Sequence, residues 1–252
     1  MPAAIDRDTL LDALDRELEP DRFDDYCPNG LQVEGRREIR RIVSGVTASH
    51  ALILAAIEQE ADLILVHHGY FWRGEPQPVV GMKHRRLRAL LQHDINLVAY
   101  HLPLDAHPEL GNNAQLGLHL GLLTEGALRP DGVGLVGRLP EARPAEQFAA
   151  AIGAVLGRPP TWIQGGSHPV LRVAWCTGGA QSMLTMAAAY GIDAFISGEI
   201  SEQTTLEARE LGVHYFAAGH HATERYGPRA LGAWCAARFG VHHSFVDIPN
   251  PA

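Results

Sequence analysis

Residues 61–75 read ADLILVHHGYFWRGE, in which an apolar run ends directly in two histidines. A short run such as DLILV, flanked by helical patterns, predicts a strand that is buried on both faces. His67 and His68 follow at its carboxyl end. In open α/β sheets ligands bind beyond the carboxyl ends of the strands, and imidazole is the commonest metal ligand. The pair therefore marks a candidate site as well as a strand.

The same alternation of short apolar runs and amphipathic helical patterns continues outward in both directions. Ser49 is placed to cap a helix that begins at residue 50. Strands separated by helices predict parallel βαβ units and an α/β fold. Because the two halves repeat one rhythm, we expect two similar α/β lobes, 1–125 and 126–252. A stretch rich in Gly and Pro, near residues 124–145, predicts the irregular boundary or crossover between them.

Polar residues gather where the predicted strands end. Asp105 and His101 follow INLVAY, and Glu199 follows IDAFIS. Behind the other strands come Thr177, Gly178, Gly179, His220, His221 and Glu224. Since the carboxyl ends of parallel strands meet at one edge of a sheet, this pattern indicates a constellation of imidazoles and carboxylates.

Imidazole and carboxylate ligands together suit Zn, Fe, Mn or Co, and we expect a site for two such divalent ions. His220 and Glu224 are four positions apart, so on a helical turn both can reach one ion. His67 and His68 point in opposite directions in a regular strand. If the backbone turns at the strand end, each can serve a different ion, and the ions can activate a water for attack.

Each of these signals has a structural alternative. An isolated HH pair more often packs than binds, and an HxxxE pair is often a surface helix contact. Glu199 can cap a helix, or act beside the site in proton transfer. Gly178 and Gly179 most simply form a turn. Packing or an interface is favoured over a substrate wall for Tyr70, Phe71 and Trp72. Convergence at three strand ends favours the metal site.

Composition narrows the class of protein. The chain has 252 residues and a formal net charge of -8, so a global basic surface for nucleic acid is absent. Three distant cysteines and no CxxC pair fit a reducing cytosol. The charged N-terminus lacks the apolar core of a signal peptide, and no apolar run is long enough to predict a membrane span. We expect a cytoplasmic protein.

Three motifs together resemble one family: VHHGYFW (66–72), AYHLPLDAHPELGNNAQLG (99–117) and AGHHATERYGPRAL (218–231). It is the Nif-three-like family of dinuclear metal-centre proteins, commonly labelled GTP cyclohydrolase 1 type 2 homologues, and the match is to its short bacterial type. The resemblance implies two similar α/β lobes with two metal ions in the cleft between them. It also implies toroidal homohexamers. Carried over, its ligands are His67, His68, Asp105, His220 and Glu224.

The resemblance implies a metal-dependent hydrolase that uses an activated water, and its label suggests GTP, whose imidazole ring would open with release of formate. His101, His107 and Glu199 are the candidates for proton transfer, Glu199 also for a supporting role. The sequence has no GxxxxGK[ST] loop for a triphosphate. The small-molecule substrate, possibly a nucleotide, therefore rests on analogy. The alternative is a non-catalytic ring protein that handles metal or binds nucleic acid in a regulatory role.

Overall fold

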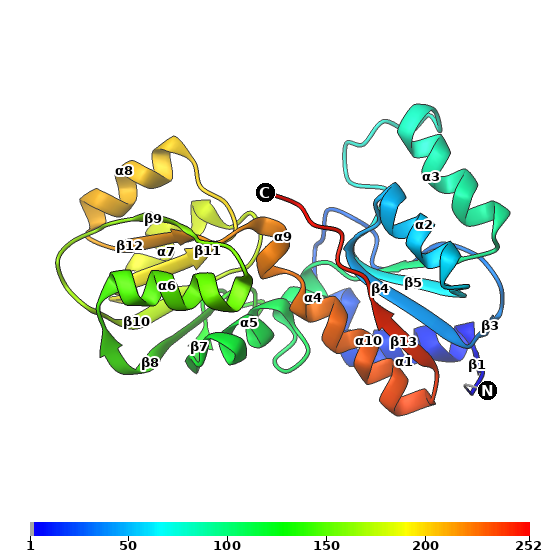
Figure 1. The fold of residues 1–252 in the computed structure, drawn as a ribbon, viewed down its shortest axis with the longest axis horizontal. Coiled ribbons are helices and arrows are strands. Elements are labelled where there is room, and N and C mark those ends of the chain that lie inside the picture. Colours follow the sequence, from blue (N-terminus) through cyan, green and yellow to red (C-terminus); the bar gives the residue numbers. More distant parts are fainter. Residues whose placement is uncertain (1–2) are drawn as a thin grey trace. The chain divides into compact units, whose positions relative to one another are not determined.

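The computed structural model describes residues 3–252, so the first two residues of the stretch tested for a signal peptide lie outside it. The chain forms two compact units (Figure 1). The first comprises residues 1–104 and 227–248, and the second comprises residues 105–226 and 249–252. This division differs from the one expected at residue 125. The first stretch of the first unit ends at Leu104, and the chain returns to that unit after Tyr226.

The first unit is built on a five-stranded sheet in the order β13-β4-β5-β6-β2. Four strands are parallel: β13 (His242–Phe245), β4 (Arg41–Thr47), β5 (Leu63–His68) and β6 (Asn96–Ala99). The edge strand β2 (Gly30–Val33) is antiparallel to β6. A separate antiparallel pair joins β1 (Ile5–Asp6) to β3 (Glu38–Ile39).

Helices cover both faces of this sheet, which makes it an α/β layer (Figure 1). One face packs on α2 (His50–Glu58) and α3 (Gly81–Gln92), with Val43, Ile64, Leu52 and Leu90 in its core. The other helices are α1 (Arg7–Leu18), the 3-10 turn η1 (Pro20–Arg22) and α10 (Tyr226–Phe239). Ser49 caps α2 by accepting from the backbone N–H of Leu52, as predicted.

The second unit has a six-stranded sheet in the order β7-β8-β10-β11-β12-β9. Its centre is parallel: β10 (Val170–Trp175), β11 (Ala194–Ser197) and β12 (His214–Ala217). Its helical segments are α5 (Asn112–Leu120), α6 (Ala145–Leu156), η2 (Gln181–Met183), α7 (Leu184–Ala188), α8 (Glu202–Leu211) and α9 (His220–Thr223). The short helix α4 (Leu102–Ala106) contains the step from one unit to the other.

Alternation along the central strands sets two layers of core in this unit. Val173, Ile196 and Phe216 pack with Phe148 and Ile152 of α6. Neighbouring strand residues point to the opposite face, where Figure 1 shows α7 and α8. Both units thus repeat one scheme of three consecutive parallel strands between helices, and the α/β prediction is confirmed.

The prediction of an irregular boundary near residues 124–145 is wrong. The stretch forms β7 (Leu123–Ala127) and β8 (Leu135–Arg143), which pair antiparallel at the edge of the second sheet. Its glycines supply the turn between them, since Gly132 and Gly134 have φ of +90° and +76°. The third antiparallel strand is β9 (Thr161–Ile163). A composition typical of loops concealed the strands β7 and β8 in the sequence.

Candidate metal centre

Three imidazoles meet at the carboxyl end of the first sheet. His67 and His68 are the last two residues of β5, and His101 follows β6. The ring centroid of His67 lies 4.5 Å from that of His68 and 5.0 Å from that of His101. One ring nitrogen of each lies within 4.8 Å of the others, so the trio could hold a metal ion. Adjacent strand residues thus converge where the strand ends.

Each of these rings is fixed through its Nδ1 atom. Nδ1 of His67 lies 3.0 Å from the carbonyl oxygen of Tyr100, and Nδ1 of His68 lies 3.1 Å from Oγ1 of Thr47. Nδ1 of His101 lies 2.7 Å from Oδ1 of Asp25. Metal-binding histidines almost always engage their second nitrogen in this way, because it sets the tautomer and the ring direction. With Nδ1 engaged, Nε2 is the ring nitrogen left to face a metal ion.

Asp25 is the site residue that sequence reasoning missed. Burial by itself would raise its pKa, but hydrogen bonds and charge from His101, with further donors from Asn29 and the backbone, lower the pKa to about 2. Together with Cys27 and His101 it forms a second group of metal-ligand types. The available signal was the acidic loop DRFDDYCPNG, which lies far from His101 in the sequence.

In the second unit, Asp105 lies in a buried polar network. Its Oδ1 accepts from Nδ2 of Asn112 at 2.9 Å and from Oγ1 of Thr177 at 3.4 Å. Asn113 donates to the carbonyl of Asp105 and accepts from the backbone N–H of Thr177. Asn112 is the first residue of α5, whose N-cap residue is Gly111, and its side chain holds Asp105.

His220 stands between two carboxylates. Its Nδ1 lies 2.7 Å from Oε1 of Glu199, and its Nε2 lies 3.2 Å from Oε2 of Glu224. Burial disfavours its protonated form, but Glu224 and then Glu199 outweigh burial and raise the pKa of His220 to about 9. His220 begins the single helical turn α9, and Glu224 is its C-cap residue. Glu199 directs His220, which favours its supporting role over helix capping.

The turn after β10 lies directly against these carboxylates. Gly178 has φ of +67°, and a Cβ there would overlap Oε1 of Glu224. Its backbone N–H donates to Oγ1 of Thr223 in α9. Burial, followed by the charges of Asp105 and Glu224, raises the pKa of the Cys176 thiol. Both carboxylates therefore lie near the end of β10, and the glycine in this turn leaves space for the carboxylate of Glu224.

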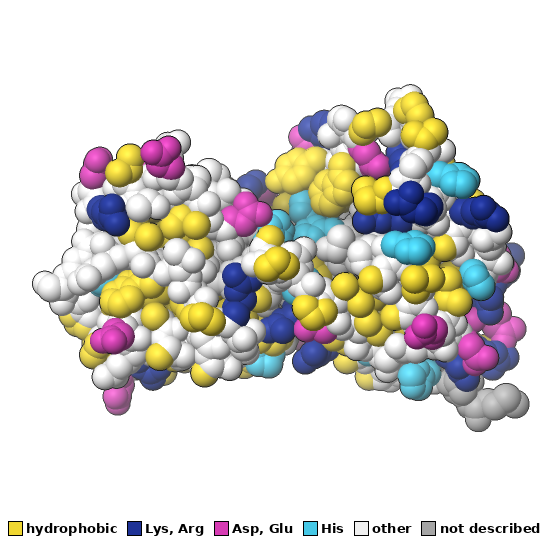
Figure 2. All heavy atoms as spheres, turned by 45° about the horizontal axis from the view of Figure 1, so that its top comes forward, with side chains coloured by type: hydrophobic (Ala, Val, Ile, Leu, Met, Phe, Trp, Pro, Cys, Tyr) yellow, Lys and Arg dark blue, Asp and Glu magenta, His cyan; other side chains and the backbone are white. Residues whose placement is uncertain are grey.

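The remaining candidates have structural roles. Tyr70 is buried and its hydroxyl donates to the carbonyl of Ala48, which confirms packing. Nε2 of His243 lies 2.7 Å from Oγ of Ser44, which holds the ring against β4. His107 accepts from the backbone N–H groups of Glu109 and Leu110. Figure 2 shows other histidines singly at the surface, and exposed ones include His50, His84 and His93.

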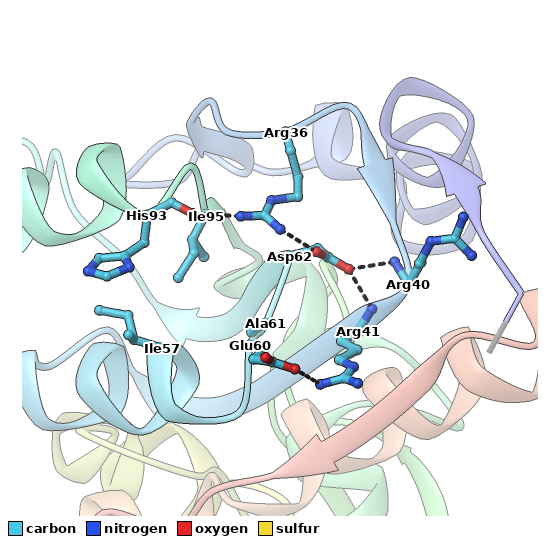
Figure 3. Close-up of a pocket in the computed structure, with 9 residues that line it drawn as sticks. All are labelled: Arg36, Arg40, Arg41, Ile57, Glu60, Ala61, Asp62, His93 and Ile95. Carbon is cyan, nitrogen blue, oxygen red and sulfur yellow. Dashed lines mark hydrogen bonds and ion pairs between the residues drawn. The ribbon is translucent and has the colours of Figure 1, made fainter. Parts of the chain in front are cut away.

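A different hollow opens at the amino ends of β4 and β5 (Figure 3). Its arginines are engaged within the fold. Asp62 accepts from Arg36 at 3.0 Å and from the backbone N–H groups of Arg40 and Arg41 at 2.7 and 2.8 Å. Arg41 also pairs with Glu60. This network anchors the start of β4, and it lies at the strand end opposite to the histidines.

The whole described chain has relatives of known sequence. Residues 5–251 match the family described as Duf34/NIF3 (NGG1p interacting factor 3). The chain belongs to the Duf34/NIF3 family. A Pseudomonas aeruginosa member named GTP cyclohydrolase 1 type 2 homolog is 56% identical over 252 residues, which covers 99% of this chain and 100% of the relative.

Two solved structures share the fold of this family member along nearly its whole length. Protein ybgI, described as of unknown function, has a TM-score of 0.96 and 50% identity over 98% of this chain and 100% of its own. TTHA1606 from Thermus thermophilus has a TM-score of 0.91 and 40% identity over the same shares. The family resemblance inferred from three motifs is thereby confirmed. Clusters of histidine with carboxylate that could hold metal are present in this member.

Proposed function

We propose that the chain binds two divalent transition-metal ions, from Zn, Fe, Mn and Co, and acts as a metal-dependent hydrolase. The ligands are His67 and His68 of the first unit with Asp105, His220 and Glu224 of the second. The observation that carries the proposal is that the Nδ1 atom of each of the three imidazoles is held by a neighbouring oxygen. Tyr100 holds His67, Thr47 holds His68, and Glu199 holds His220. A fixed Nδ1 is the arrangement that metal-binding imidazoles need.

The donor set fits such ions. Neutral imidazole and carboxylate ligands suit borderline transition metals, whereas Ca²⁺ and Mg²⁺ prefer oxygen ligands alone. Bound ions of this kind supply a water whose pKa is low enough for attack at neutral pH. Glu199 directs His220, and Asn112 directs Asp105, so neither ligand has to be reoriented when the ion binds.

The substrate is proposed to be a small molecule with a hydrolysable bond, and GTP is the first to test because of the name that the relatives carry. His101 is the group we propose to accept a proton, at Nε2, because Asp25 engages its Nδ1. A net charge of -8 disfavours nucleic acid as the main partner.

The deciding experiment begins with metal analysis of the protein as isolated. The protein loaded with the metal it carries is then given GTP, followed by a panel of nucleotides, phosphoesters and amides. Formate and a ring-opened product would identify the cyclohydrolase reaction. Retained metal without turnover of any substrate would instead favour a metal-handling protein, and salt-dependent binding to single-stranded DNA a regulatory one.

We propose a homohexamer, which sedimentation at several protein concentrations can test, and a cytoplasmic location. The three cysteines of the described chain are free and buried, as suits a reducing compartment. Among residues 3–252, no helix combines the length and apolar character needed to cross a membrane.

A further inference from the structure

The carboxylate of Asp25 is engaged on both oxygens. Oδ1 accepts from Nδ1 of His101 and from the backbone N–H of Tyr26, each at 2.7 Å. Oδ2 accepts from Nδ2 of Asn29 at 3.0 Å and from the backbone N–H of Leu102 at 2.9 Å. Only 3% of the Asp25 side chain is exposed. Four donors around one buried carboxylate fix its position and its ionised form.

This arrangement dictates how His101 carries its proton. An ionised carboxylate offers acceptors only, so Nδ1 of His101 must be the donor. The neutral ring then has its hydrogen on Nδ1 and its lone pair on Nε2. Charge-assisted hydrogen bonds of this length are among the stronger ones in proteins, so the opposite tautomer is strongly disfavoured.

Three further contacts hold His101, one through its backbone and two through its ring. Its backbone N–H donates to Oδ1 of Asn29 at 2.8 Å. Its ring centroid lies 5.4 Å from that of Tyr26 and 5.0 Å from that of Trp72, the latter at an interplanar angle of 83°. These contacts limit rotation of the side chain and keep the ring beside His67 and His68.

The loop that carries Asp25 is itself tied down by Arg73. The backbone N–H of Arg73 donates to the carbonyl of Tyr26 at 2.6 Å, and its guanidinium donates to the carbonyl of Asp25 at 3.0 Å. Arg73 also pairs with Asp24, whose side chain is 92% exposed. The segment after β5 and the segment 24–29 thus form one support for His101.

We propose that Asp25 is a positioning residue that acts through His101. It fixes the Nδ1–H tautomer of His101 and directs Nε2, as a hydrogen-bond acceptor, toward His67 and His68. Only the identity of the group that Nε2 of His101 contacts rests on the proposed function. The tautomer itself is independent of that function. Asp25 needs no contact with substrate for this role, and neither Asp25 nor His101 is required as a metal ligand.

The test compares Asp25→Asn with Asp21→Asn, which removes an exposed carboxylate of η1 outside the segment 24–29. Long-range ¹H–¹⁵N spectra of the full chain without metal report the tautomer of His101. Wild type and Asp21→Asn should both show the Nδ1–H form. Asp25→Asn should shift His101 toward the Nε2–H form, because an amide can donate to Nδ1. Asp25→Glu should restore the Nδ1–H form in part.

Metal content and rate separate this proposal from the proposed function. Zinc bound by Asp25→Asn should stay within twofold of wild type, while kcat on any substrate found should fall by about 10² or more, as when another catalytic histidine loses its orienting carboxylate. An Nε2–H or doubly protonated His101 in wild type would overturn the inference, even if Asp25→Asn failed to fold. So would loss of zinc in Asp25→Asn with the tautomer unchanged. Absence of any substrate would count against the hydrolase alone, since the tautomer is measured without turnover.

Discussion

A side chain at Gly178, in the turn after β10, would overlap the carboxylate of Glu224. The left-handed backbone there, with φ of +67°, and the closeness of Oε1 require glycine for separate reasons. The turn therefore shapes the ligand set although it contributes no ligand.

Gly178→Ala should reduce metal content because the new methyl group displaces Glu224. The matched control is Gly191→Ala, where φ is +65° and no heavy atom lies within 4 Å of the added Cβ. Both variants should lose about 1–2 kcal/mol of unfolding free energy through the left-handed backbone. Only Gly178→Ala should also bind less metal, as measured by elemental analysis. Equal metal content in the two variants would contradict the role of this turn.

Removal of a proposed ligand should open the coordination sphere. We expect His68→Ala or Glu224→Ala to lower bound metal from about two ions per chain to about one or fewer. His50→Ala, in which an exposed histidine at the start of α2 is removed, should keep the wild-type content. Inductively coupled plasma mass spectrometry of dialysed protein provides the measurement. Unchanged content in both ligand variants would refute the proposed site.

Glu199→Gln tests the carboxylate that directs His220. The amide can still contact Nδ1 but lacks the charge, so affinity for a transition metal should fall by about 10–100-fold. Competition with a chromophoric chelator measures this affinity. Glu210→Gln, at an exposed position near the end of α8, is the control for charge alone. An equal change in both variants would show that Glu199 acts only through overall charge.

His243 should make stability depend on pH. Burial, and then the neighbouring His242 and Arg229, lower its pKa from 6.5 to about 4. Below pH 6.5 the unfolded chain therefore takes up a proton that the folded chain refuses. The contribution to stability is complete above pH 6.5 and declines as the pH falls toward 4. The decline is at most about 1.4 kcal/mol per pH unit, and solvent reduces it because the ring is only partly buried.

Urea unfolding at pH 7.5 and 5.0 measures this difference. His243→Gln should lose less stability between the two pH values than wild type, although its stability at pH 7.5 should be lower because the bond to Ser44 is weakened. His242→Gln alters the exposed neighbour and should keep most of the pH dependence. A pH dependence in His243→Gln equal to that of wild type would assign the effect to other groups.

The sequence by itself determined the central strands, most helices and the strand-end position of the polar residues. Periodicity is local, so β5, β6, β10, β11 and β12 follow from their own apolar runs. The family resemblance then named the ligands from three motifs. The antiparallel pair β7 and β8 was not predicted because its glycines and proline resemble a loop, and pairing with a neighbour is a tertiary property.

Only the tertiary structure decided which residues direct the site. Asp25 and His101 are 76 positions apart, and Glu199 and His220 are 21 apart. No local period links such pairs, since their contact is created when separate loops meet at the end of a sheet. The apolar run at 63–66 thus determined where the two histidines stand. Which nitrogen each imidazole presents was decided by oxygens of Tyr100, Thr47, Asp25 and Glu199. Because each of these oxygens engages Nδ1, Nε2 is the nitrogen that remains for a metal ion or a proton.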